Sequence, residues 1–358
     1  MKNNQKADLK LILENKINTL NRKCFIYGAG NTSLLYGIES FDKTKLNIVA
    51  FIDGNPDKIG TKFLNKPVIS LDECVKNYEN PLVFINVGTV KTINQVIDLL
   101  NEKHIEHYIL DKFIFSQNKE KILNIYNILE DDLSKETYAN IILARMNEAK
   151  QDFSLVRNNQ YFAVPEFCQN NPNEIFVDCG AYVGDTIEKY LFIKQGIFKQ
   201  IYAFEPESKN YNALKHRIER LNKEWALSSE KIKTEEAAIS DTDSRGQLSS
   251  VKSDSPSLGA QIIHDDNGNI SLIKLDTYFS NKKMTFLKAD IESHEQKLLS
   301  GAKNVIIRDK PLLSICIYHN AYDMFEIPLL IKEINPDYKL FIRHHYFNFS
   351  ETVLYACE

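Results

Sequence analysis

Short hydrophobic runs separated by amphipathic stretches dominate the first third of the chain. The apolar run Cys24–Tyr27 stops at Gly28 and Gly30, and further apolar runs cover 46–52, 82–87 and 108–110. Apolar residues at helical spacing occupy 31–38, 70–78 and 92–103. Short apolar runs bounded by turn residues predict buried strands, and their alternation with helices predicts βαβ units in a mostly parallel sheet. We therefore expect a Rossmann-like N-terminal domain over residues 1–112.

The pattern changes to helical periodicity between 118 and 153, which predicts a helical connector over residues 113–170. Strand–helix alternation then returns over residues 171–358. Strands are predicted at 175–178, 200–204, 233–239, 272–275, 286–291, 312–318, 338–344 and 352–357. The polar stretch 240–257 is typical of a loop or surface insertion, and the last two strands are expected to pair as an antiparallel hairpin. The predicted fold class is α/β, with two Rossmann-like doubly wound sheets.

Composition narrows the class of protein. Hydrophobic residues make up 43% and charged residues 26%, which is ordinary for a folded globular chain. The 44 basic residues do not exceed the 48 acidic ones, so we expect no nucleic-acid partner. No run of about 18 apolar residues occurs, so no membrane span is expected. The six cysteines are scattered without a C-x-x-C pair, which favours free thiols and a cytoplasmic protein. Abundant Asn, Lys and Ile are typical of a bacterium with an AT-rich genome.

A strand-to-helix turn in the second half carries the clearest chemical signal. The predicted strand that contains Asp178 leads into Gly180 and Gly184, and a helix is predicted from Thr186. Glycines let the backbone approach a ligand closely, and the free N–H groups at the start of a helix favour an anion. The next strand ends at Glu205, where a carboxylate could accept hydrogen bonds from both ribose hydroxyls of an adenosyl ligand.

Four motifs in this order resemble the FkbM-type methyltransferases. They are 177–186, 204–206, 273–278 and 287–292. The resemblance covers about residues 171–357 and implies a class I methyltransferase sheet and an enzyme that uses S-adenosylmethionine, commonly to O-methylate sugars. It implies the following cofactor-binding residues: Asp178, Gly180, Ala181, Gly184, Asp185, Thr186, Glu205, Pro206, Ala238, Ile239 and Asp290. The family commonly has Gly where this chain has Ser293, and we expect that side chain beside the acceptor site.

Methyl transfer to a hydroxyl needs alignment of acceptor and methyl group and removal of a proton. Candidates follow the predicted fourth and fifth strands, and our choice of catalytic residues is His319, Asp290, Glu292 and His294. His319 is the preferred general base, with Asp290 as its competitor or orienting partner. Asp290, Glu292 and His319 could instead hold a divalent metal that acidifies the hydroxyl.

The acceptor itself is expected to be a small molecule, a nucleotide-activated or glycan-linked hexose or heptose used for capsule, lipopolysaccharide or another surface glycan. The side chains expected to bind it are Tyr318, Asn320, Arg343 and His344. For the segment around Arg343, solvated surface charge is the competing explanation, because alternation along a strand puts neighbouring side chains on opposite faces. A homo-oligomer is an open option.

The glycine turn of the first domain allows a second ligand site. Gly28, Gly30 and Asn31 follow a predicted strand, Asp53 ends the next one, and Ser33 stands where a dinucleotide fingerprint would have its third glycine. The segments 51–56 and 66–70 resemble the nucleotide-binding-like domain found ahead of some sugar-modifying enzymes. A fold retained for packing is an equal explanation. Two alternatives to a methyltransferase remain: an NAD-dependent nucleotide-sugar oxidoreductase or epimerase, and a non-catalytic nucleotide-binding scaffold.

Overall fold

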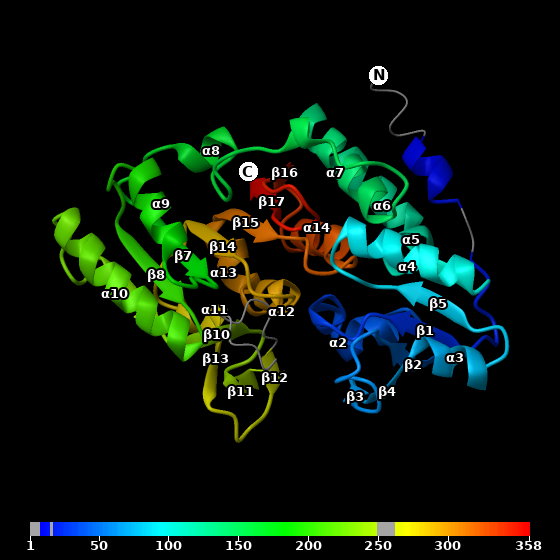
Figure 1. Cartoon of the computed structure of the whole chain (residues 1–358). Coiled ribbons are helices and arrows are strands. Elements are labelled where there is room, and N and C mark those ends of the chain that lie inside the picture. The colour runs from blue at the N-terminus through cyan, green and yellow to red at the C-terminus, as the bar shows by residue number, and fades with distance from the viewer. Residues whose placement is uncertain (1–7, 15–16, 249–261) are drawn as a thin grey trace.

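The computed structural model describes residues 8–14, 17–248 and 262–358. Two large sheets form separate lobes, with a group of helices between them (Figure 1). The first sheet has the strand order β3-β4-β2-β1-β5-β6, and all its pairs are parallel except β3 with β4. Its strands are β1 (Cys24–Tyr27), β2 (Ile48–Ile52), β3 (Lys62–Phe63), β4 (Lys66–Ile69), β5 (Leu82–Ile85) and β6 (Glu106–Ile109).

Helices cover both faces of this sheet, which confirms the doubly wound prediction. Cys24 and Ile26 of β1 pack in one cluster with α2 (Asn31–Lys43) and α5 (Leu110–Gln117). Phe25 points the opposite way, toward α3 (Leu71–Asn77) and α4 (Val90–Glu102). Since successive residues of a strand point to opposite faces of the sheet, the short apolar run of β1 contributes to the hydrophobic cores on both faces. The prediction missed the β3–β4 hairpin, because its two short strands lack an apolar run.

The stretch between the two large sheets is mainly helical. It contains α6 (Lys119–Ile128), α7 (Asp132–Arg145), the 3-10 turn η1 (Phe153–Leu155) and α8 (Pro165–Cys168). α7 packs along β16 (Lys339–His344), and α6 packs on α14 (Asp323–Ile334). On the other side of this junction, Lys43 of α2 lies 2.8 Å from Glu326 of α14. The connector and α2 therefore both tie the first sheet to the second lobe.

The second sheet has seven strands in the order β16-β17-β15-β14-β7-β8-β9. Besides β16 they are β7 (Ile175–Cys179), β8 (Gln200–Phe204), β9 (Ile232–Glu235), β14 (Phe286–Ala289), β15 (Leu312–Cys316) and β17 (Thr352–Cys357). β17 runs antiparallel to both of its neighbours, so the predicted terminal hairpin is confirmed. Its helices are α9 (Asp185–Ile193), α10 (Ser208–Glu224), α11 (Leu275–Tyr278), α12 (Glu295–Gly301), α13 (Lys303–Asp309) and α14.

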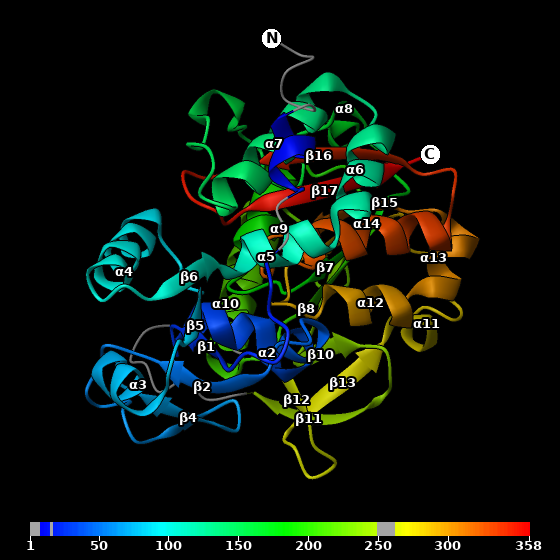
Figure 2. The same ribbon diagram turned by 90° about the vertical axis from the view of Figure 1, so that its right-hand side faces the viewer.

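Two local predictions were wrong around a small additional sheet of order β10-β13-β11-β12, which lies beneath α12 in the rotated view (Figure 2). The predicted strand 233–239 is divided at Glu236: β9 stays in the large sheet, and β10 (Ala237–Ser240) joins the small one. The predicted loop 240–257 contains β11 (Ser244–Leu248), which pairs with β13 (Ile270–Lys274) and β12 (Ile262–His264). The polar composition of β11 hid it, because all its side-chain-bearing residues are half-buried or exposed. Residues 249–257 lie outside the described residues.

None of the helices in the described ranges combines the length and the apolar character needed to cross a membrane.

Candidate active site

A cavity of about 250 Å³, partly open to solvent, lies at the carboxyl ends of β7, β8 and β14. β10 and the turns after β14 and β15 complete its wall. β7 lies at the point where the chain order of the strands reverses, so the turns after β7 and β14 diverge and leave a crevice. Ligands of open α/β sheets bind in crevices of this kind. The glycine turn predicted after β7 and the carboxylate of Asp290, which follows β14, therefore lie at the same site.

The glycines of the β7–α9 turn are required by close packing. Gly180 has φ +75°, and a Cβ there would lie 1.9 Å from the Asp290 carbonyl oxygen. Gly184 has φ +82° and begins α9 without a side-chain cap. Gly180, Asp185 and Thr186 line the cavity, whereas Ala181 and Gly184 do not. The turn therefore lies directly against the end of β14 and keeps backbone N–H groups available at the start of α9.

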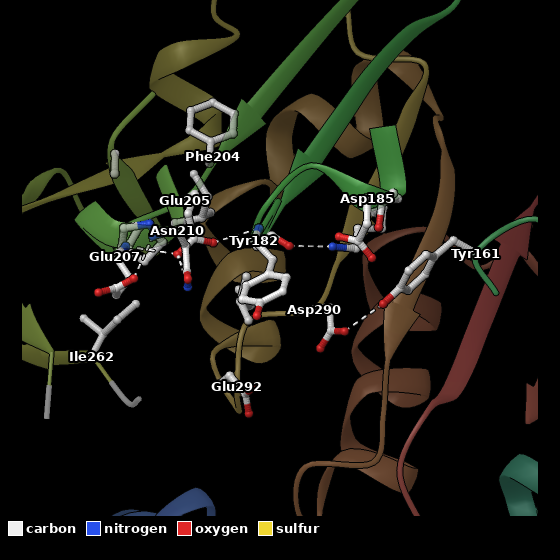
Figure 3. Close-up of a pocket in the computed structure, with 18 of the residues that line it drawn as sticks. Tyr161, Tyr182, Asp185, Phe204, Glu205, Glu207, Asn210, Ile262, Asp290 and Glu292 are labelled. Atoms are coloured by element: carbon white, nitrogen blue, oxygen red, sulfur yellow. Dashed lines mark hydrogen bonds between the residues drawn. The ribbon is translucent and has the colours of Figure 1, made fainter. Parts of the chain in front are cut away.

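Glu205 lies at one end of the cavity (Figure 3), and Pro206, the next residue, also lines it. Its Oε2 accepts a hydrogen bond from the Tyr182 N–H at 2.9 Å, and Oε1 accepts one from Glu207 N–H at 3.0 Å. Burial raises the pKa of Glu205, and these N–H groups oppose the rise. Ala238 and Ile239 of β10 line the same end, where they provide an apolar wall. The carboxylate is thus held in a fixed orientation by backbone donors.

Asp178 does not line the cavity, although it lies two residues before Gly180, which does. Its carboxylate is fully buried, and Oδ1 lies 2.9 Å from Lys288 Nζ. Lys288 lines the cavity and donates a hydrogen bond to the Gly180 carbonyl at 2.7 Å. Burial raises the pKa of Asp178 to about 6, although the Lys288 charge opposes this. Lys288 was not predicted as a site residue, although a lysine inside an apolar strand is a signal for a buried functional charge.

The opposite end of the cavity gathers hydroxyl and carboxyl groups around Asp290. The Tyr161 hydroxyl donates to Asp290 Oδ2 at 2.7 Å, and the Tyr318 hydroxyl donates to Oδ1 at 3.3 Å. Glu292 and Glu351 line this end as well. Figure 3 shows Tyr161 reaching Asp290 from the opposite wall to Glu205. The sequence analysis missed Tyr161 and Glu351, because each lies in a loop far from any motif.

Glu351 is the residue immediately before β17, and its backbone has φ +65°. Its Oε2 accepts a hydrogen bond from Gln160, and its Oε1 lies 3.5 Å from the Tyr318 hydroxyl. Burial and the Asp290 charge raise the pKa of Glu351 to about 7, while the Gln160 hydrogen bond opposes this rise. The cavity therefore holds one carboxyl group whose proton is exchanged near neutral pH.

His319 lies behind the cavity wall, fully buried among carboxylates. Nε2 is 3.2 Å from Asp290 Oδ1 and 3.5 Å from Glu292 Oε2, and Nδ1 is 3.2 Å from Glu295 Oε1. Burial alone would lower the pKa of His319, but the charge of Glu295 and the hydrogen bonds to Asp290 and Glu295 raise it well above its ordinary value. The pKa of Asp290 is correspondingly lowered, although burial opposes this. Without a metal ion, the surrounding carboxylates favour the protonated form of the imidazole.

Asp290, Glu295 and His319 could together hold a cation, since one ligand atom from each lies within 4.8 Å of the others. The predicted metal set contained Glu292 in place of Glu295. Glu295 is fully buried at the start of α12, and its Oε1 accepts a hydrogen bond from the Ile291 N–H at 2.8 Å. Carboxylates with one imidazole are suitable ligands for a divalent metal.

Several residues that were predicted to lie at the catalytic or acceptor site do not line the cavity. His294 precedes α12, and burial lowers its pKa to about 4. Asn320 accepts hydrogen bonds from the N–H groups of Tyr322 and Asp323. Ser293 does not line the cavity; it has φ +74°, and Asn320 Nδ2 lies 3.5 Å from its hydroxyl.

The predictions for Arg343 and His344 are corrected for the same reason. Arg343 is buried and donates to Asp131 Oδ2 at 2.6 Å and to Ser134 at 2.8 Å, so it joins β16 to α7. His344 is buried against Thr352, with a ring nitrogen 2.8 Å from its hydroxyl. The surface-charge explanation was also wrong for these two side chains. Tyr318 is the predicted acceptor-binding residue that lines the cavity.

The N-terminal glycine turn lines a second cavity, with Gly28, Gly30 and Asp53 among its walls. A Cβ at Gly28 would lie 2.4 Å from the Asn86 carbonyl oxygen, so this turn also needs a glycine. Asp53 Oδ2 accepts hydrogen bonds from Ala29 N–H at 3.0 Å and from Lys58 at 3.1 Å. Asn31 is exposed and does not line this cavity. The carboxylate of Asp53 is thus already bound by the protein.

Comparison with known proteins agrees with this geometry. Residues 178–349 match the family model described as the methyltransferase FkbM domain, and residues 20–106 match the one described as C2185-like, N-terminal. The solved structure of methyltransferase FkbM from Methylobacillus flagellatus KT is similar over 99% of both chains, at 18% identity and a TM-score of 0.57. An rRNA methylase from Streptococcus thermophilus matches 53% of this chain and 88% of its own, at 13% identity and a TM-score of 0.32.

A comparison with curated proteins gave no match. The family match covers the turn after β7, the carboxylate after β8 and Asp290, whereas Tyr161 and Glu351 of the same cavity lie outside the matched residues. On this evidence residues 178–349 are a methyltransferase domain of the FkbM type, the domain of an S-adenosylmethionine-dependent enzyme.

Proposed function

We propose that the protein is an O-methyltransferase that acts on a sugar hydroxyl in the cavity between Glu205 and Glu351. The observation that carries this proposal is the division of the cavity into two chemically different ends. One end has a carboxylate, apolar β10 residues and a glycine turn, and the other has acidic and phenolic groups. These ends suit an adenosyl cofactor and a polyhydroxylated acceptor, respectively.

The residues at the first end fit S-adenosylmethionine. The turn at Gly180 has no room for a Cβ, so its backbone borders the cavity closely. We infer that Glu205 binds the ribose hydroxyls, that Ala238 and Ile239 contact the adenine, and that Gly180, Asp185 and Thr186 surround the methionine part. When bound, S-adenosylmethionine supplies a methyl group whose carbon bonds to the acceptor oxygen while the carbon–sulfur bond breaks, its electron pair going to sulfur.

The chain's own contribution is alignment and proton removal. Asp290, with its two phenolic partners, borders the site where the acceptor hydroxyl must lie. We infer that Glu351 accepts the hydroxyl proton, because its pKa of about 7 gives it both a populated basic form and proton affinity near neutral pH. A protonated His319 lacks the free lone pair that a base needs, so we favour Glu351 over it.

The charge of the acceptor end favours a neutral acceptor. Among the described residues, Lys288 is the cation that lines the cavity, and Asp178 neutralises it. Asp290, Glu292 and Glu351 would repel a phosphate placed beside them. Hydroxyl groups, which can donate to these carboxylates, fit better. We place the enzyme in the synthesis of a bacterial capsule, lipopolysaccharide or another surface glycan, in a reducing cytoplasm that suits its six free cysteines.

Mass spectrometry tests this function directly. Incubation with S-adenosylmethionine and a panel of free, nucleotide-linked and oligomeric sugars should add the mass of one methyl group to a sugar and release S-adenosylhomocysteine. Methylation only on nitrogen, or on RNA, would refute the proposal. Metal assistance through Asp290, Glu295 and His319 is the alternative to base catalysis alone. It predicts loss of turnover after exhaustive chelation and recovery with added Mg²⁺ or Mn²⁺.

A further inference from the structure

The cavity at the N-terminal glycine turn has no part in the function proposed above. We call it the N-terminal cavity. Its volume is about 460 Å³, compared with about 250 Å³ for the catalytic cavity, so it has room for a small molecule. The residues that line it all belong to 27–99, and they lie at the carboxyl ends of β1, β2 and β5 and along α4. The N-terminal domain therefore forms this cavity by itself.

The N-terminal cavity lies in the first sheet where the catalytic cavity lies in the second. β1 is flanked by β2 and β5, as β7 is flanked by β8 and β14, and all four of these pairs are parallel. The helices that follow β1 and β5, which are α2 and α4, pack on opposite faces of the first sheet. Their divergence leaves a crevice at the ends of the strands, where open α/β sheets bind ligands.

The glycine after the central strand is the first feature that the two sheets share. Gly28 directly follows β1 and has φ +121°, and a Cβ there would lie 2.4 Å from the carbonyl oxygen of Asn86, the first residue after β5. Gly180, directly after β7, faces the carbonyl oxygen of Asp290, the first residue after β14, in the same way. Both glycines line their cavities. In each sheet the turn therefore borders the cavity with its backbone.

The carboxylate after the next strand is the second shared feature. Asp53 directly follows β2; its Oδ2 accepts a hydrogen bond from the Ala29 N–H at 3.0 Å, and its Oδ1 accepts one from the Asn55 N–H at 2.9 Å. Glu205, after β8, likewise accepts one hydrogen bond from the glycine turn and one from the residue two positions further on. In doubly wound sheets an acid at this place binds the ribose hydroxyls of a nucleotide.

Asp53 has capacity left for the hydroxyls of a ligand. A carboxylate has about four acceptor positions. Two are used by backbone N–H groups, and a third by Lys58, whose Nζ lies 3.1 Å from Oδ2. The Lys58 side chain is 39% exposed, and an ion pair this exposed contributes little, so a ligand hydroxyl can replace it. Each oxygen of Asp53 can then accept one hydroxyl of a ribose.

Asn86 provides a further acceptor in a fixed orientation. The Ser33 hydroxyl donates to the Gly28 carbonyl at 2.6 Å, so its oxygen accepts from the amide nitrogen of Asn86 at 3.0 Å. This arrangement leaves Asn86 Oδ1 without a hydrogen-bond partner among the described residues, although only 6% of the residue is exposed. Because Asn86 lines the cavity, this oxygen is available to a donor group on a ligand.

The other walls of the N-terminal cavity suit the uncharged part of a nucleotide. Val87, Val96 and Leu99 are apolar, and Thr92 and Gln95 provide hydroxyl and amide groups. Among the described residues that line the cavity there is no Lys, Arg or His, so no cation there would pair with a phosphate. A base and a ribose, which are flat or polyhydroxylated and carry no charge, therefore fit these walls better than a phosphate does.

We propose that the N-terminal cavity binds a ribonucleoside group, either as the free nucleoside or as part of a nucleotide. The ribose lies on Asp53, and the base lies against the apolar residues of α4. The site goes beyond the proposed function, because neither the sugar acceptor nor the general base assigned above has a part in it. Asn86 occupies the position that Asp290 has in the other sheet, so we expect binding without reaction.

Two substitutions with matched controls test this site. Asp53→Asn removes the carboxylate charge, and Asp57→Asn, at an exposed position nearby, is its control. Gln95→Trp places a large ring in the cavity from α4. Its control is Asn101→Trp, an exposed position of the same helix that does not line the cavity. Thermal unfolding and calorimetric titration with S-adenosylmethionine show whether each variant is folded and keeps its cofactor site.

The probes are adenosine, guanosine, cytidine and uridine, with their 2′-deoxy forms and their 5′-diphosphates, titrated by calorimetry. We expect at least one ribonucleoside to bind and its 2′-deoxy form to bind about 10- to 100-fold more weakly, because a hydrogen bond to a charged group is lost. Asp53→Asn and Gln95→Trp should each weaken ribonucleoside binding by about tenfold or more, whereas both controls should match the wild type. Comparison of each nucleoside with its diphosphate shows which of the two is the preferred form.

The variant Glu205→Gln separates this site from the cofactor site. Nucleoside binding should persist in Glu205→Gln, and S-adenosylmethionine binding should persist in Asp53→Asn. Nucleoside binding that is lost in Glu205→Gln but kept in Asp53→Asn would place the nucleoside in the catalytic cavity and overturn the proposal. Equal binding of ribose and 2′-deoxyribose forms, or no binding by any nucleoside or nucleotide, would also overturn it.

Discussion

Lys288 and Asp178 are register partners on the neighbouring parallel strands β14 and β7, with Nζ 2.9 Å from Oδ1 and both side chains buried. Burial alone would lower the pKa of Lys288, but the Asp178 charge raises it. Lys288→Met leaves a buried carboxylate without its counter-charge. We expect this variant to lose about 3–5 kcal/mol of unfolding free energy, as measured by urea denaturation at pH 8.

The matched control is Lys303→Met, whose partner Glu333 is exposed at 3.6 Å, and it should change stability by less than about 0.5 kcal/mol. The double variant Asp178→Leu/Lys288→Met removes both charges and should recover most of the loss, because an apolar pair of similar volume carries no desolvation penalty. If the double variant is no more stable than Lys288→Met alone, the buried charge is not the cause.

Glu205 presents a carboxylate that backbone N–H groups already orient toward the cavity. Glu205→Gln keeps the shape but removes the charge that strengthens hydrogen bonds to ribose hydroxyls. Hydrogen bonds to charged groups contribute about 1.5–3 kcal/mol, so the Kd for S-adenosylmethionine should rise about 10- to 100-fold in calorimetry. The exposed Glu219, changed to Gln, should leave the Kd unaltered. An unaltered Kd in Glu205→Gln would place the ribose elsewhere.

The sequence predicted the fold well because both sheets are built from short apolar runs with glycine turns at their ends. Gly180 and Glu205 could be predicted as site residues, since the carboxyl ends of adjacent parallel strands meet at one edge. Tyr161 and Glu351 could not. Each reaches its position through packing between segments distant in the chain, which leaves no local pattern. Arg343 was predicted to bind the acceptor for a related reason. Its partners are Asp131, which caps α7, and Ser134 of α7, and sequence spacing does not show such a pairing.

Ser293 occupies a left-handed backbone conformation where the family commonly has glycine. A side chain at φ +74° costs about 1 kcal/mol relative to glycine, and the added freedom of glycine in the unfolded chain offsets part of this gain. We expect Ser293→Gly to raise the unfolding free energy by about 0.5–1 kcal/mol, measured by thermal or urea unfolding. Ser293→Ala keeps the Cβ and removes the hydroxyl, so it should bring no gain. Equal stabilisation by both variants would show that the hydroxyl is responsible.

The pH dependence of turnover tests the role of Glu351. Because burial and the Asp290 charge raise its pKa to about 7, the carboxyl group is protonated below that pH and cannot accept a proton from the acceptor. The rate should therefore rise with pH and level off above about pH 7, and it should fall about tenfold per unit in the acidic range. Glu351→Gln should lose this limb and reduce kcat by about 100-fold or more. Glu292→Gln, in the same cavity, should keep the limb, whereas a limb that persists in Glu351→Gln would identify another residue as the base.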